Sequence, residues 1–95
     1  MSDQLTAATF LPHVEKIFRV KGGRHALRLS RVDTPIDTPG APRQSFNLIF
    51  SGPAGDVLRE GLYTLEVENG PPFDLYVMPI HTPQLGRQDY QAAFN

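Results

Sequence analysis

The sequence contains no cysteine, which excludes disulfide bonds, thiolate-bound zinc, iron–sulfur clusters and thiol catalysis. It also has no apolar run approaching the roughly 20 residues that a membrane-spanning helix needs. The net charge of −1 favours neither a nucleic-acid partner nor an acidic tail. Residues 1–4 carry neither a basic nor an apolar segment, so we expect no signal peptide, no membrane contact and a cytoplasmic location.

What remains is the composition of one small folded domain. Of the 95 residues, 40% are hydrophobic and 20% are charged, which is the ordinary balance of a globular protein. We therefore treat residues 1–95 as a single domain. Nine prolines and eight glycines predict frequent turns and short elements rather than long helices.

Short apolar segments separated by turn residues predict a small β structure. The expected strands are 17–20, 26–32, 46–50, 63–68, 73–80 and 90–94. One helical turn is expected before Pro12, with Thr6 as its N-cap. We expect its apolar side chains to cover one end of the fold, namely those of Leu5, Phe10 and Leu11. A second helical turn is expected over 56–61. The predicted fold class is all-β, a small antiparallel meander barrel of five or six strands with a short N-terminal helical turn.

The first two strands form the clearest local pattern. Gly22 and Gly23 lie between them and predict a two-residue hairpin turn in which both glycines have positive φ. This turn sets Phe18 opposite Leu27 and Ile17 opposite Arg28. Because side chains alternate between the two faces of a strand, one face joins the core and the other is basic. The predicted core positions are Phe18, Val20, Leu27 and Leu29, and the outward positions are Ile17, Arg19, Lys21, Arg24 and Arg28.

The basic face of this hairpin is the main candidate for a binding surface. Six of the nine basic residues lie between Lys16 and Arg31, and such a face could hold a phosphate backbone. It lacks interleaved aromatic residues, and barrel closure or dimerisation could neutralise it against Glu66 and Glu68. We add Ile36 from the proline-rich loop 33–44, which is long enough for a contact role. The candidate binding surface is thus Arg19, Lys21, Arg24, Arg28 and Ile36.

No pattern in the sequence indicates catalysis, and we expect no catalytic, cofactor-binding or metal-binding residue. No serine lies in a G-x-S-x-G turn, and the glycines of 52–55 lack the Lys-Ser/Thr that follows a phosphate loop. His13 and Glu15 could share a metal ion, but no third ligand stands at a useful spacing. An enzyme would have to bring His13, Glu15 and His81 together in a pocket.

The strand cores and turns resemble those of an uncharacterised family of short bacterial domains of unknown function, of about this chain's length. The resemblance lies in residues 5–6, 10–12, 46–53, 61–65, 75–80 and 90–95. It covers almost the whole chain but implies no active site, since its motifs are structural. One departure is visible, because Glu15 stands where the family pattern has a glycine before the strand of Phe18.

The resemblance also implies a kind of function, since members of that family are often encoded near phage-tail-collar-like or tail-fibre-like proteins. We therefore expect a non-enzymatic structural or protein-interaction module, accessory to a phage-tail-like assembly, whose partner resembles a tail-collar protein. Two alternatives stay open. One is a barrel that binds a small ligand or nucleic acid through the basic hairpin, and the other is an enzyme of unrecognised type. The sequence leaves the oligomeric state open.

Overall fold

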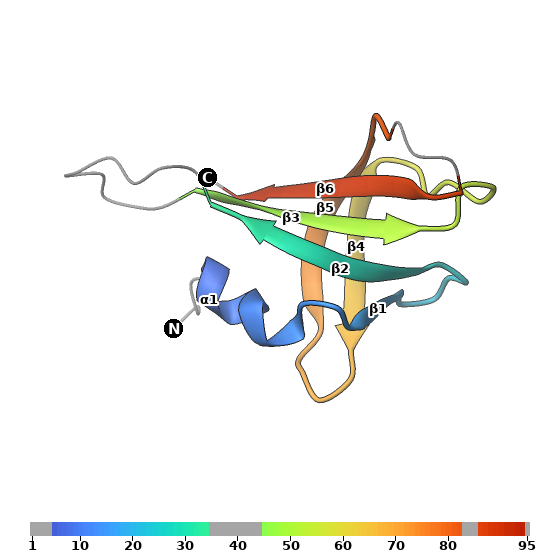
Figure 1. The fold of residues 1–95 in the computed structure, drawn as a ribbon. Coiled ribbons are helices and arrows are strands. Elements are labelled where there is room, and N and C mark those ends of the chain that lie inside the picture. The colour runs from blue at the N-terminus through green and yellow to red at the C-terminus, as the bar shows by residue number, and fades with distance from the viewer. Residues whose placement is uncertain (1–4, 35–44, 83–85, 95) are drawn as a thin grey trace.

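The computed structural model describes residues 5–34, 45–82 and 86–94, and it contains a short helical segment followed by six strands (Figure 1). The strands close into an antiparallel barrel, which confirms the predicted all-β fold class and the N-terminal helical turn. The elements are α1 (Ala7–Phe10), the 3₁₀ turn η1 (Leu11–His13), β1 (Ile17–Val20), β2 (Ala26–Asp33), β3 (Phe46–Gly52), β4 (Gly61–Val67), β5 (Phe73–Ile80) and β6 (Gln88–Phe94).

The order of strands around the barrel is β1-β2-β3-β6-β5-β4, with β4 returning to pair with β1. The chain thus forms two three-stranded meanders, β1-β2-β3 and β4-β5-β6, that meet at two seams. A meander through the whole chain would pair β3 with β4, whereas β3 pairs with β6 over seven residue pairs, from Phe46–Phe94 to Gly52–Gln88. The connection from β3 to β4 therefore passes over one end of the barrel.

The helical segment covers the other end of the barrel. Thr6 is the N-cap of α1, as predicted, and its backbone amide donates a hydrogen bond to Oγ1 of Thr9 at 3.1 Å. Phe10 is fully buried, with its ring centroid 4.7 Å from that of Phe73 on β5. Burial of one phenylalanine contributes roughly 1.5–3 kcal/mol to the free energy of unfolding. Leu11 does not share this role, since it is 57% exposed.

Inward side chains from all six strands form the core. The largest fully buried ones include Phe18, Phe50, Leu65, Leu75 and Tyr90. The predicted helical turn over 56–61 is absent, because Leu58 turns inward from an irregular segment and is only 5% exposed.

The two helical pieces of the described chain are four and three residues long. None of its helices has the length and apolar character needed to cross a bilayer.

Candidate interaction surface

The first hairpin has the predicted register but a different turn. Phe18 pairs with Leu27 and Ile17 pairs with Arg28, so Ile17 points outward. The amide of Gly23 donates to the carbonyl of Val20 at 3.1 Å, which closes a four-residue turn. Of the two glycines only Gly22 has a positive φ, 78°, and it occupies the third position of that turn. The prediction of positive φ at both glycines is therefore wrong.

The predicted basic residues are exposed, as expected, but two of them contact carboxylates. Arg24 forms a bidentate contact with Asp56, with Nη2 2.7 Å from Oδ1 and Nε 3.1 Å from Oδ2. Arg28 has Nη1 3.8 Å from Oε2 of Glu15. Ile36 lies outside the described residues. The hairpin is thus partly neutralised and is not a uniform basic face.

The Arg24–Asp56 contact shifts the pKa values of both groups in the exposed setting of the hairpin tip. The hydrogen bonds and charge of Arg24 lower the pKa of Asp56, and the same contact raises the pKa of Arg24. His25 also approaches Asp56, with Nε2 3.4 Å from Oδ1. The contact ties the hairpin tip to the segment between β3 and β4, a link that joins residues 32 positions apart.

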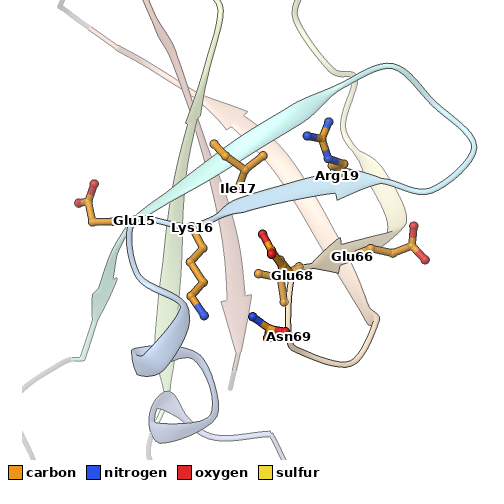
Figure 2. Close-up of a pocket in the computed structure, with 8 residues that line it drawn as sticks. Glu15, Lys16, Ile17, Arg19, Glu66, Glu68 and Asn69 are labelled. Carbon is orange, nitrogen blue, oxygen red and sulfur yellow. The ribbon is translucent and has the colours of Figure 1, made fainter.

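Barrel closure sets β4, which carries Glu66, beside this hairpin. β1 pairs with β4, and Arg19 and Glu66 are direct partners in the register. Both side chains point outward and are exposed. Figure 2 shows that they diverge rather than meet. Among the residues that the structure describes, neither takes part in an ion pair. The surface salt bridges that the sequence suggested for closure are therefore not formed at this pair.

A groove of about 760 Å³ runs along this seam between β1 and the end of β4 (Figure 2). Ile17 lies on its wall and is 45% exposed, although it is a large apolar residue. Ile17 also borders a second, shallower groove of about 330 Å³ that reaches Arg28 and Pro53. We call the outward side chains of this region the seam face. Its members are Ile17, Arg19, Lys21, Glu66 and Glu68.

Two residues in the left-handed backbone region flank the groove, Glu15 with φ 75° and Asn69 with φ 62°. Asparagine tolerates this conformation, whereas glutamate adopts it at a cost. The amide of Glu15 donates to the carbonyl of Leu29 at 2.7 Å, which holds the chain as it enters β1. The φ of Glu15 is therefore one that favours glycine, which is the residue that the resemblance leads us to expect at this position.

In the described part of the chain, the three histidines do not converge on one site. His13 is buried and packs edge-on against Phe18 and Phe73, each with centroids 6.2 Å away. Its Nδ1 has no hydrogen-bond partner among the residues that the structure describes. Glu15 is exposed, and so is His81 just after β5. Within 5–34, 45–82 and 86–94, no three histidine, aspartate or glutamate side chains lie close enough to hold a metal ion.

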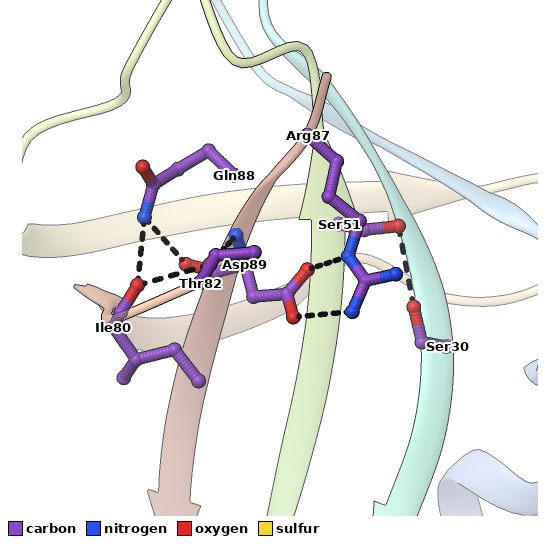
Figure 3. A network of polar contacts seen from close by, with 7 residues as sticks. All are labelled: Ser30, Ser51, Ile80, Thr82, Arg87, Gln88 and Asp89. Carbon is purple, nitrogen blue, oxygen red and sulfur yellow. Dashed lines mark hydrogen bonds and ion pairs between the residues drawn. The ribbon is translucent and has the colours of Figure 1, made fainter. Parts of the chain in front are cut away.

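Sequence reasoning missed a polar network where β5 and β6 meet (Figure 3). Arg87 contacts the nearly buried carboxylate of Asp89 at 3.0 and 3.2 Å. The amide of Asp89 donates to Oγ1 of Thr82 at 2.8 Å, and Gln88 donates to the carbonyl of Ile80 at 2.8 Å. The sequence feature that could have predicted the contact between Arg87 and Asp89 is the spacing Arg-x-Asp, which places both side chains on one face of a strand. The network fixes the start of β6.

Comparison with known proteins adds a family but no activity. The family model described as Domain of unknown function (DUF6916) matches residues 5–94, and the chain belongs to this family. No curated protein and no solved structure showed significant similarity to the chain. The family assignment supports the resemblance seen in the strand cores and turns.

Proposed function

We propose that this member of the DUF6916 family is a non-enzymatic interaction module that binds a protein partner through the seam face. The observation that carries the proposal is Ile17, an apolar side chain left 45% exposed beside a groove and framed by charges of both signs. Protein interfaces typically combine a small apolar centre with a polar rim. The free charges of Arg19 and Glu66 supply such a rim, which adds specificity to the contact.

We further propose that the partner belongs to a phage-tail-like assembly, where the protein serves as an accessory. The resemblance to domains encoded near tail-collar-like proteins supports this assignment. A cytoplasmic location stays a prediction from the sequence.

The alternative of a nucleic-acid or small-ligand barrel receives less support. Arg24 is held by Asp56, Arg28 faces Glu15, and Glu66 on β4 lies beside Arg19. A phosphate backbone approaching Arg19 would also meet the negative charge of Glu66.

The test is affinity capture with tagged protein from source lysate, with and without nuclease, read by mass spectrometry and by nucleic-acid absorbance. Wild type is compared with Ile17→Asp and with the control Val57→Asp, whose parent side chain is 48% exposed but lies off the seam face. We expect a tail-like protein that survives nuclease, is lost with Ile17→Asp and is retained with Val57→Asp. If nucleic acid is the only component captured, and Arg19→Ala reduces its capture, the nucleic-acid alternative is established instead.

A further inference from the structure

The charges of the chain are strongly segregated although they nearly cancel. Residues 16–32 contain six bases and no acid, whereas residues 60–86 contain four acids and no base. The first set lies on and beside the β1–β2 hairpin, and the second on and beside the β4–β5 hairpin. Because β1 pairs with β4, two of these bases and two of these acids run side by side on the outside of the barrel. We call Arg19 and Lys21 the basic stripe, and Glu66 and Glu68 the acidic stripe.

The register shows how these stripes face one another. Arg19 lies directly beside Glu66, and the amide of Lys21 donates to the carbonyl of Thr64 at 2.9 Å. Thr64 in turn is the partner of Asp74 on β5, and its hydroxyl donates to Oδ1 of Asp74 at 2.6 Å. Arg19, Lys21 and Glu66 form no ion pair within the described residues. Both stripes therefore retain charges available to a partner.

A surface with one basic and one acidic stripe is complementary to itself. A second copy can be related to the first by a two-fold axis that runs parallel to β1 and β4 and lies above their seam. This rotation places the basic stripe of each copy on the acidic stripe of the other. A two-fold contact uses the same patch on both copies, so every charge pair occurs twice. In this arrangement Arg19 of each copy meets Glu66 of the other, and Ile17 is covered beside these pairs.

We propose that the seam face binds a second copy of this chain, forming a two-fold dimer held by reciprocal Arg19–Glu66 pairs. This inference rests on the proposed function, because it uses the same surface. A second copy and a tail-like partner would therefore compete for the seam face. The contact depends on a few exposed charge pairs, and each such pair contributes little to affinity. The dimer is therefore weak, and it weakens further as salt screens its charges.

Sedimentation equilibrium over a concentration series, at low and high salt, tests the proposal. Wild type should form dimers at low salt and dissociate at high salt. Arg19→Glu and Glu66→Arg should each lose self-association, with a dissociation constant raised at least about tenfold, because every pair then joins like charges. An equimolar mixture of the two variants should regain a dimer, because each contact again joins an acid with a base. Arg59→Glu makes the same charge change off the seam face and should leave self-association intact.

Far-UV circular dichroism and thermal unfolding establish that each variant is folded before it is compared. A wild type that stays monomeric at low salt, or a mixture that fails to associate, overturns the dimer. Growth of the mixture into species larger than a dimer overturns the two-fold geometry and indicates head-to-tail contacts. If the dimer fails while Ile17→Asp still abolishes capture of a partner, the proposed function stands without this inference. If the dimer fails and Ile17→Asp also leaves the capture of a partner unchanged, both the dimer and the proposed function are refuted.

Discussion

The phenol oxygen of Tyr90 accepts a hydrogen bond from the backbone amide of Leu58 at 2.8 Å, and both residues are buried. Tyr90 belongs to β6, whereas Leu58 lies in the irregular segment between β3 and β4. This bond gives a partner to an amide that has no strand to pair with. It therefore holds the connection between the two meanders against the core.

Tyr90→Phe should lower the free energy of unfolding by about 1–3 kcal/mol, because the amide of Leu58 then stays buried without a partner. Urea denaturation measures the loss. Tyr63→Phe is the matched control, since the hydroxyl of Tyr63 donates to the carbonyl of Arg59 at an exposed site and water can replace it. Equal losses in the two variants would contradict the special role of the buried amide.

Glu15→Gly should be more stable than Glu15→Ala by about 0.5–1 kcal/mol. Both variants remove the carboxylate that faces Arg28, so they differ in the energetic cost of adopting a φ of 75° at position 15. Glycine adopts that conformation without steric cost, although part of the gain is lost to its greater freedom in the unfolded chain. Thermal unfolding of the two variants side by side measures the difference, and an alanine variant at least as stable as the glycine one would refute it.

Gly70→Ala should destabilise the protein by about 1–3 kcal/mol through overpacking. An added Cβ would stand 2.7 Å from Cγ1 of Val67 and 2.9 Å from Cε1 of His13. Gly55→Ala is the control, since nothing lies within 4 Å of its added carbon and its φ is not positive. Chemical denaturation should place Gly55→Ala close to wild type, and a similar loss at both positions would argue against the contact.

Arg24→Gln should raise the pKa of Asp56 toward its ordinary value, as followed by carboxyl NMR during acid titration. Because the folded-state pKa of Asp56 is lowered, the stability from this contact is present above the unfolded pKa. It is lost as the pH falls through the folded pKa. The melting temperatures of wild type and Arg24→Gln should therefore converge on acidification. A constant difference between them would show that the contribution of Arg24 does not depend on the charge of Asp56.

Glu60→Gln should lower the pKa of Tyr76 toward its ordinary value. The hydroxyl of Tyr76 donates to the carboxylate of Glu60, and this bond and charge raise the pKa of the phenol. Ultraviolet absorbance of tyrosinate during alkaline titration should show one tyrosine ionising earlier in the variant. An unchanged titration would exclude the contact in solution.

Local parts of the fold could be predicted because they depend on neighbouring residues. The alternation in 17–20 and 26–32 and the glycines between them fix which residue faces which, and Phe18 and Leu27 pair as predicted. The segment 56–61 was mispredicted because the capping signal of Asp56 competes with a tertiary contact. Burial of Leu58 and its bond to Tyr90 outweigh one turn of helix.

The candidate site was predicted only in part, because its other half comes from a distant strand. Arg19 and Arg28 do point outward beside grooves. That Arg24 binds Asp56 follows from the course of the segment between β3 and β4. That Glu66 lies beside Arg19 follows from which strands become neighbours around the barrel. Alternation within one strand carries no information on that order, which is set by long-range pairing.

The two seams have a consequence for how the chain folds. Each meander can form from contacts close in sequence, but the barrel closes only when β1 reaches β4 and β3 reaches β6. Both pairings close long loops, and the entropy of closure must be overcome before the core forms around Phe10 and Phe50. Neither meander encloses a core alone. Folding should therefore be a single cooperative event on the slow, millisecond-to-second timescale typical of β-barrels.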